Sequence, residues 1–337
     1  MNKNSEISVI VPIYNGEKYI KRCLQSLLNT AIKYDLIVVN DGSSDNSDEI
    51  IRCFETKDKR IKYVKSPNLG ASHARNLGLK CCSTKFVMFC DCDDEFEPGT
   101  IDRINEIILK YNWGLIEFNR IDISNGKYGK KMMSNNNISI LTKNDYIENY
   151  FSLTNSSCYS VINKIYHTSI IKDNCLQFNE QLRYSEDLEF NLKYLNYSHD
   201  SLIMQVPFVS YYRYCNQNSI VFTSNDNYFE METEHIEDLY NSKLINNKIY
   251  SNLIIHFAFI SLDRIVRGYD EFEKKDAILK IYEIKKDCDN KNIKLFYSIK
   301  GIFIFYSILL NVNIKLFYYI TSSLFYNKRK ILEKRKS

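Results

Sequence analysis

The chain has 337 residues, of which 45% are apolar and 26% charged, and basic residues exceed acidic ones by four. This length predicts one large domain with an accessory segment, and the composition is that of a folded protein, not a disordered one. The small net charge gives no reason to expect a nucleic-acid partner, and we expect none. Ten scattered cysteines without a CxxC pair and a first apolar run too short for a signal peptide predict a cytoplasmic protein.

Apolar runs of strand length alternate with helical patterns over the first ninety residues. Ile20, Leu24, Leu27 and Leu28 follow helical spacing, and a second helix is predicted from Ser44 to Phe54. This alternation predicts an α/β fold in which helices flank a mostly parallel sheet. Ligands of such sheets bind beyond the carboxyl ends of the strands. The predicted strands are Ile7 to Ile13, Leu36 to Val39, Ile61 to Val64 and Phe86 to Cys90.

The densest group of acidic residues follows the fourth predicted strand. Asp91, Asp93, Asp94 and Glu95 stand there within five residues. Acidic turns at strand ends often do no more than face water. Closely spaced carboxylates at the ligand-binding edge of a sheet are, however, what a hard divalent cation bridging phosphates requires. We therefore expect a metal site here in preference to a plain turn.

Three further segments follow strands or open a helix. VPIYNG contains Pro12 and Tyr14, VNDGSSD contains Asp41, and GASHARNLG contains Arg75. Asp41 could accept hydrogen bonds from a base or a ribose, or it could belong to a capped strand-to-helix loop. Arg75 suits a nucleotide or phosphate contact. Each segment by itself is weak evidence.

Taken together and in this order, SVIVPIYNG, VNDGSSD, GASHARNLG and FCDCDDEF resemble the donor-binding blocks of the family 2 glycosyltransferases. The resemblance implies a GT-A fold, with Pro12, Tyr14 and Asp41 lining a pocket for a nucleotide, usually a uridine nucleotide, and Arg75 beside it. It also implies that Asp91 and Asp93 form a DxD motif that holds ribose and a Mn²⁺ or Mg²⁺ ion. Asn40 departs from the family, which commonly has a second acid there.

Further along, the segment YSEDLEF looks like the family's ED block and precedes a predicted helix from Phe190 to Leu195. Acidic residues also favour helix N-termini without any catalytic role. The resemblance makes Asp187 the expected general base, which would take the proton of the acceptor hydroxyl. It further implies a single displacement with inversion at the anomeric carbon.

Two other segments, Asn163 to Tyr166 and Tyr211 to Ile220, look like parts of bacterial enzymes that build surface polysaccharides. Arg213 in the second segment would either contact the donor pyrophosphate or stack on its tyrosine neighbours. The resemblance implies transfer of a hexosyl or N-acetylhexosaminyl group from a UDP-sugar to a glycan or lipid-linked glycan acceptor.

The sequence predicts a catalytic domain over residues 1–221 and a helical accessory region over residues 222–337, with a loop from Ser124 to Asn137. Within the accessory region, Gly301 to Tyr326 is rich in aromatic and aliphatic residues, contains one charge and precedes a basic tail. Such a segment favours a helix lying in the membrane interface, at the inner leaflet, over a helix packed on the protein or a membrane span. The expected location is the cytoplasm, peripheral at its membrane.

Two other classes of function compete with a glycosyltransferase. A sugar-phosphate nucleotidyltransferase would need a glycine-rich basic loop after the first strand, and VPIYNG is not one. A non-catalytic, membrane-associated scaffold that binds sugar nucleotides would not need both the acidic block, Asp91 to Glu95, and the ED pair, Glu186 and Asp187. GxGxxG, P-loop and GxSxG motifs are also lacking in the sequence, which removes the usual dinucleotide, P-loop and hydrolase interpretations.

Overall fold

A computed structural model describes residues 4–111, 113–133, 136–150, 159–198, 202–215 and 228–267. Its centre is a sheet of ten strands in the order β3-β2-β1-β4-β9-β6-β10-β5, with β7 paired to β6 and β8 to β10. The strands are β1 (Asn4–Ile13), β2 (Lys33–Asp41), β3 (Ile61–Ser66), β4 (Phe86–Phe89), β5 (Glu95–Phe96), β6 (Leu115–Ser124), β7 (Lys127–Lys131), β8 (Ser139–Leu141), β9 (Lys164–His167) and β10 (Ile203–Tyr214).

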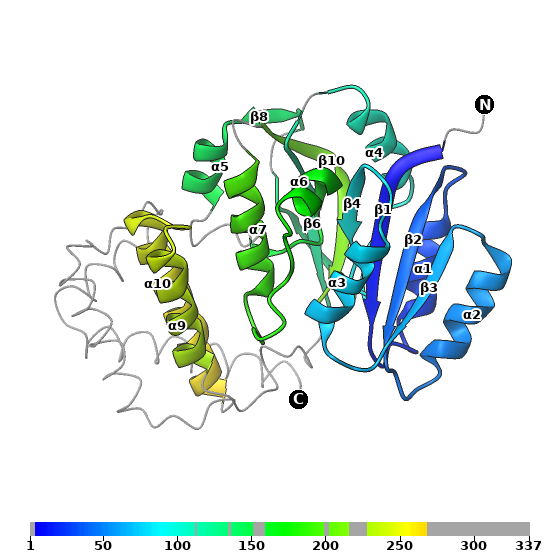
Figure 1. Cartoon of the computed structure of the whole chain (residues 1–337), viewed down its shortest axis with the longest axis horizontal. Helices are drawn as coiled ribbons and strands as arrows, with labels where there is room; N and C mark the ends of the chain where they lie inside the picture. Colours follow the sequence, from blue (N-terminus) through cyan, green and yellow to red (C-terminus); the bar gives the residue numbers. More distant parts are fainter. Residues whose placement is uncertain are drawn as a thin grey trace. The chain divides into compact units, whose positions relative to one another are not determined.

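The helices of the described residues lie between these strands and after them. They are α1 (Ile20–Leu28), α2 (Ser47–Lys57), α3 (Ala71–Cys81), α4 (Thr100–Ile108), α5 (Lys143–Tyr150), α6 (Thr168–Asp173), α7 (Glu186–Tyr197), α9 (Tyr228–Asn241) and α10 (Asn247–Arg267). The predicted α/β architecture is confirmed, since helices flank a mixed, largely parallel central sheet (Figure 1). No helix within the described ranges is both long and apolar enough to cross a membrane.

The first four long strands are parallel neighbours. β1 pairs in parallel with β2 and β4, and β2 pairs in parallel with β3. Their carboxyl ends therefore meet at one edge, the lower edge of the sheet in Figure 1. β9 is antiparallel to both β4 and β6 and separates this group from the parallel pair β6 and β10. That insertion has no counterpart in the alternating sequence pattern.

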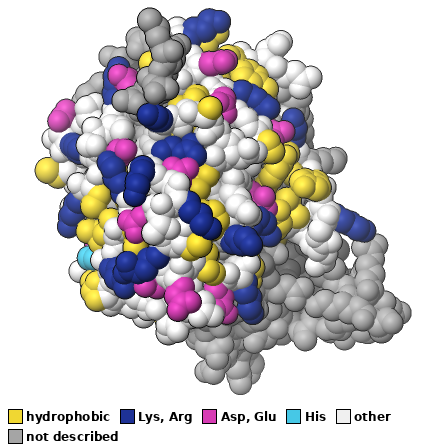
Figure 2. All heavy atoms as spheres, turned by 90° about the vertical axis from the view of Figure 1, so that its right-hand side faces the viewer, with side chains coloured by type: hydrophobic (Ala, Val, Ile, Leu, Met, Phe, Trp, Pro, Cys, Tyr) yellow, Lys and Arg dark blue, Asp and Glu magenta, His cyan; other side chains and the backbone are white. Residues whose placement is uncertain are grey.

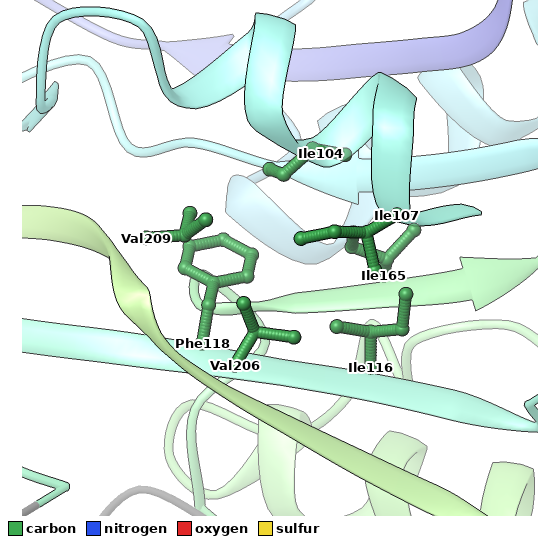
Figure 3. A pocket seen from close by; sticks show the side chains of 7 residues that line it. All are labelled: Ile104, Ile107, Ile116, Phe118, Ile165, Val206 and Val209. Atoms are coloured by element: carbon green, nitrogen blue, oxygen red, sulfur yellow. The ribbon is translucent and has the colours of Figure 1, made fainter. Parts of the chain in front are cut away.

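Apolar side chains fill the space on both faces of the sheet. Alternate residues of β1 and the inward-facing stripe of α1 belong to one buried cluster, as expected for strand and helix periods of two and 3.6 residues. Another part of this core, between α4 and the strands β6, β9 and β10, is a narrow apolar pocket (Figure 3). Its lining residues are Ile104, Ile107, Ile116, Phe118, Ile165, Val206 and Val209.

On the opposite face, α3 lies directly against β1. A Cβ atom added at Gly78 would meet the Ile10 side chain at 2.5 Å, so this glycine permits the close approach. Arg75 lies three residues earlier, on the same side of the helix, and is buried with it. α7 covers the neighbouring part of this face, where Phe190 stacks on Phe178 with ring centroids 4.2 Å apart. The close packing of α3 therefore fixes where Arg75 lies.

The prediction of a loop from Ser124 to Asn137 was wrong, because β7 occupies residues 127–131 and forms a hairpin with β6. The turn consists of Asn125 and Gly126, with φ angles of 52° and 72°. Two positive φ values at an Asn-Gly pair are typical of a two-residue hairpin turn. This turn signal was present in the sequence. The predicted start of the helix at Phe190 was also late, since α7 begins at Glu186.

The chain divides into two compact units, one formed by Met1–Ile147 with Ser157–Asn216 and the other by Glu148–Ser156 with Gln217–Ser337. In the second unit α9 and α10 pack together, and the Tyr240 and Tyr250 rings lie 4.8 Å apart. The predicted boundary at residue 221 and the segment from Gly301 onward lie outside the described residues.

Basic and acidic side chains of the first unit alternate on the surface at the β3 edge of the sheet, where α2 also lies. Figure 2 shows basic and acidic groups interspersed over this face. Asp48 pairs with Lys65 and with Arg52, and Asp35 pairs with Lys62. Such exposed ion pairs contribute little to stability.

Candidate active site

Asp41 ends β2 and holds the loop that leads into α3. Its Oδ1 atom accepts hydrogen bonds from Ser66 Oγ at 2.7 Å and from the Leu69 amide at 3.0 Å. Its Oδ2 atom accepts one from the Gly70 amide at 2.6 Å. The carboxylate is buried and thus fixes the entrance to α3. Its predicted contact with a nucleotide stays a prediction, and such a contact would share these oxygens.

The segment after β1 is fixed by hydrogen bonds to the segment after β2. The Asn15 amide donates to Ser43 Oγ at 3.0 Å, and the Ser44 amide donates to Asn15 Oδ1 at 2.9 Å. Pro12 is buried inside β1, whereas the Tyr14 side chain is 51% exposed. The segments after β1 and β2 are thus joined to each other, and the Tyr14 ring next to them is exposed to solvent.

Asp94 lies at the centre of the acidic block, where sequence reasoning had placed it only close to the metal pair. Its carboxylate is buried and accepts hydrogen bonds from the Tyr211 hydroxyl at 2.8 Å and the Tyr214 amide at 2.7 Å. The Tyr211 oxygen also accepts a hydrogen bond from the Asp91 amide at 3.0 Å. Burial, and then the charges of Asp91 and Asp93, raise the pKa of Asp94 well above its usual value. Asp94 therefore orders the block from within.

Arg22 of α1 supports the same block from the other side and was not predicted. It donates to the backbone oxygen of Asp93 at 2.6 Å and lies 2.7 Å from a carboxylate oxygen of Glu95. Its guanidinium carbon lies 3.7 Å from the centre of the Tyr214 ring. Nothing in the spacing of the sequence connects α1 with this block, so the signal could not be found there.

Arg75 joins the acidic block to the ED pair. Its Nη2 atom lies 3.0 Å from Asp91 Oδ1, and its Nη1 atom lies 3.1 Å from Glu186 Oε1 and 3.3 Å from Asp187 Oδ1. The Arg75 side chain is only 7% exposed. Sequence reasoning placed Arg75 beside a nucleotide, and the structure places it among three carboxylates. These contacts bring Asp91 and Asp187 into one site.

Asp187 lies in the first turn of α7, with 18% of its side chain exposed. Its Oδ2 atom accepts a hydrogen bond from the Val161 amide at 3.2 Å. The preceding residue, Ser185, has a φ angle of 57°, a left-handed conformation that is uncommon for a residue with a side chain. Burial raises the pKa of Asp187 to about 7 although the Arg75 guanidinium opposes the shift. A carboxyl group that titrates near neutral pH is suited to take a proton from an alcohol.

Arg213 and Lys164, from the segments Tyr211 to Ile220 and Asn163 to Tyr166, have partners inside the protein. Arg213 forms a double hydrogen bond with Asp122, at 2.9 and 2.6 Å, and its contact with the donor pyrophosphate stays a prediction. Lys164 is fully buried beside Glu117, with 3.4 Å between their charged atoms. Both pairs fit a structural role.

The acidic block suits a divalent cation by the chemistry of its donors. Asp91 and Asp93 provide hard carboxylate oxygens at the carboxyl edge of the sheet. Burial is the main reason why the pKa of Asp94 is raised, and the charges of Asp91 and Asp93 add to it, so a cation would relieve the second of these causes. Within the described ranges there is no group of three or more His, Cys, Asp or Glu residues that could hold a metal ion. Two carboxylates are nevertheless typical of a cation that is bound together with substrate phosphates.

The parallel strands, with two aspartates after β4 and a partly buried carboxylate at the start of α7, match a GT-A domain. Residues 8–174 match the family model described as Glycosyl transferase family 2. This match confirms the resemblance inferred from the sequence blocks of the chain.

Several bacterial glycosyltransferases are similar in sequence. The chain is 39% identical to glycosyltransferase GlyA of Streptococcus pneumoniae over 37% of its own length and 17% of GlyA. It is 30% identical to the uncharacterized glycosyltransferase EpsJ of Bacillus subtilis over 55% of both chains. It is 26% identical to the poly(ribitol-phosphate) beta-N-acetylglucosaminyltransferase TarP of Staphylococcus aureus over 72% of this chain and 75% of TarP. The chain thus spans less than two thirds of the length of GlyA and EpsJ.

Among solved structures, residues 1–349 of S. aureus TarS in complex with UDP-GlcNAc are similar to this chain. The TM-score is 0.58 at 25% sequence identity, covering 78% of this chain and 72% of that one. This likeness confirms the predicted GT-A fold.

Proposed function

We propose that this chain is an inverting, metal-dependent glycosyltransferase that moves a hexosyl or N-acetylhexosaminyl group from a UDP-sugar to a glycan or lipid-linked glycan. Bacterial surface-polysaccharide synthesis is the process in which we place it. The observation that carries the proposal is the cluster in which Arg75 contacts both Asp91, from the predicted metal pair, and Asp187, the predicted base. An acid pair for the donor and a base for the acceptor are the parts that such a transfer needs.

The relatives support the choice of donor and process. TarP is named a beta-N-acetylglucosaminyltransferase acting on poly(ribitol-phosphate), and TarS was solved with UDP-GlcNAc. A UDP-N-acetylhexosamine is therefore the first donor to test. The proposed donor contacts are those of Pro12, Tyr14, Asp41, Arg75 and Asp91.

In the proposed reaction, Asp187 takes the proton of an acceptor hydroxyl while that oxygen attacks the anomeric carbon. The bond between the anomeric carbon and the nucleoside diphosphate breaks, and the diphosphate leaves with the bonding electrons. Attack opposite to the leaving group inverts the anomeric configuration. Asp91 and Asp93 would hold a Mn²⁺ or Mg²⁺ ion, which supplies positive charge for the leaving diphosphate when bound.

A scaffold that only binds sugar nucleotides is the rival from another class. The partly buried Asp187, with its pKa raised to about 7, favours the enzyme, because binding alone does not require a base.

The experiment is UDP release from a panel of UDP-sugars with MnCl₂ and candidate acceptors, using the parent chain and Asp93→Asn. The proposal expects acceptor-dependent UDP release by the parent and a loss of at least about a hundredfold in Asp93→Asn. UDP binding without any turnover in the panel would support the scaffold. Equal turnover in Asp93→Asn would remove this residue from the metal pair.

We also propose that the chain works in the cytoplasm, peripherally at the inner leaflet of the membrane. The support is the composition of residues 301–337, with its aromatic residues and basic tail. Removing these residues should reduce cosedimentation with vesicles that contain anionic lipids while sparing UDP binding. Unchanged cosedimentation of the shortened chain would contradict the proposal.

A further inference from the structure

We propose that Arg75 is a built-in counter-ion that holds Asp91, Glu186 and Asp187 together before any substrate binds, and that a divalent cation then shares this role. Besides its proposed contact with the donor, Arg75 would thus position the acids and join the donor side of the site to the acceptor side. The inference rests on the proposed function for the names of these two sides. Its test, however, uses cation binding and stability without donor or acceptor.

The geometry places one cation among three anions. Arg75 Nη2 lies 3.0 Å from Asp91, and Nη1 lies 3.1 and 3.3 Å from Glu186 and Asp187. The exposed fractions of the three carboxylates are 36%, 20% and 18%, so water screens the last two only weakly. Because Asp91 follows β4 and the other two acids open α7, the guanidinium connects two segments that are far apart in the sequence.

The charges in this cluster do not balance. With all three acids ionised, three negative charges and one positive charge leave a net charge of −2. Like charges at short range and low exposure repel strongly. Burial, and then repulsion from Glu186 and Asp91, raise the pKa of Asp187 against the effect of Arg75. A divalent cation at Asp91 would supply the missing charge.

Arginine has features here that lysine could not reproduce. The planar guanidinium serves carboxylates on two of its nitrogens at once, whereas an ammonium group is a single point charge. The guanidinium also lies 5.4 Å from the centre of the Phe178 ring. Its Nε atom is buried without a hydrogen-bond partner among the described residues. A buried donor left unpaired opposes folding, whereas the carboxylate contacts of the two Nη atoms favour the buried position of Arg75.

The test compares Arg75→Met with the parent chain in Mn²⁺ titrations by calorimetry, without nucleotide. Methionine keeps much of the apolar volume and removes the positive charge. Because Arg75 repels a cation at Asp91, we expect Arg75→Met to bind Mn²⁺ about tenfold more tightly. We also expect a lower Tm in EDTA, and Mn²⁺ should raise the Tm of this variant more than that of the parent.

Arg60→Met is the matched control. Arg60 is also mostly buried and pairs with Asp58, and it donates to the backbone oxygens of Leu28, Thr30 and Ile32. Its loss should lower the Tm without changing Mn²⁺ affinity. Unchanged or weaker Mn²⁺ binding by a folded Arg75→Met variant would overturn the inference.

A second variant covers the case in which Arg75→Met does not fold. Adding Glu186→Gln removes one negative charge and returns the cluster to a net charge of −2, leaving Asp91 and Asp187 in place. We expect this double variant to recover part of the lost Tm and the circular-dichroism signal. If neither Glu186→Gln nor Mn²⁺ restores any stability, Arg75 is not a counter-ion. A chain in which Mn²⁺ binding depends on Arg75 as expected, but which transfers no sugar, would contradict the proposed function and leave this inference standing.

Discussion

The two sides of the candidate site are built in different ways. On one side, the ends of β1, β2 and β3 are joined by hydrogen bonds, chiefly those that Asn15 and Asp41 make to neighbouring backbone amides and hydroxyls. On the other side, carboxylates outnumber the cations that contact them, and Arg75 faces three of them. The hydrogen bonds of the first side are made without a ligand, whereas the second side has more negative than positive charge. We infer that the first provides shape and the second responds to a cation.

The largest expected effect is on the charged side. Asp187→Asn keeps the size of the side chain but removes its ability to take a proton. We expect kcat to fall by about 10²- to 10⁴-fold, the usual contribution of a general base, with donor affinity nearly unchanged. Initial rates and UDP titrations would measure the two quantities. Near-normal kcat would show that Asp187 is not the base and would contradict the role given to the charged side.

On the hydrogen-bonded side, the largest change is Asp41→Ala. It leaves the Leu69 and Gly70 amides and the Ser66 hydroxyl without their acceptor. We expect a loss of about 2–3 kcal/mol in the free energy of unfolding, because buried donors remain unpaired. Urea denaturation, with Asp45→Ala as a more exposed control, would measure it. A loss below about 0.5 kcal/mol would mean that this side is not held by Asp41.

The charged side should also respond to pH. The pKa of Asp187 in the chain without substrate is raised to about 7, and the base must be deprotonated to act, so kcat/KM should rise as pH increases through 7 and level off above it. One pH unit below this pKa, about one tenth of the maximal rate remains. The residual activity of Asp187→Asn should lack this acidic limb. If the rate of the parent chain did not change between pH 5.5 and 8, the assignment of Asp187 as the base would be contradicted.

The smallest effect concerns the backbone before α7. Ser185 has a left-handed conformation with a φ angle of 57°. Glycine adopts this conformation readily, so Ser185→Gly should change the free energy of unfolding by less than about 1 kcal/mol. Ser185→Val should cost about 1–2 kcal/mol more, since a branched side chain opposes it. Equal stabilities of the two variants would show that this conformation does not persist in solution.

Much of the fold was predictable because strands, helix starts and turns have local signals. The four apolar runs became β1 to β4, and the acidic block lies directly after β4 as expected. The antiparallel strand β9 was missed, because its place between β4 and β6 depends on pairing with distant strands. The hairpin at Asn125 and Gly126 was missed although its turn signal was present.

The candidate site was predictable as a set of residues but not as a set of contacts. Asp91 and Asp187 were identified from their blocks, yet their common contact with Arg75 depends on a pairing of Arg75 with Asp187 across 112 residues of sequence. The same holds for Arg22, whose bond to the Asp93 backbone oxygen follows from how α1 packs. Tertiary packing decides such pairs, and periodicity does not reveal them.

The central claim is that the carboxylates after β4 and a divalent cation together bind a uridine nucleotide. Its most direct test is calorimetric titration of the full chain with UDP in MnCl₂ and in EDTA, repeated with Asp93→Asn. We predict that Mn²⁺ tightens UDP binding by at least about tenfold in the parent and has no such effect in the variant. UDP affinity that is equal in MnCl₂ and EDTA, or a variant that keeps the Mn²⁺ effect, would contradict the claim.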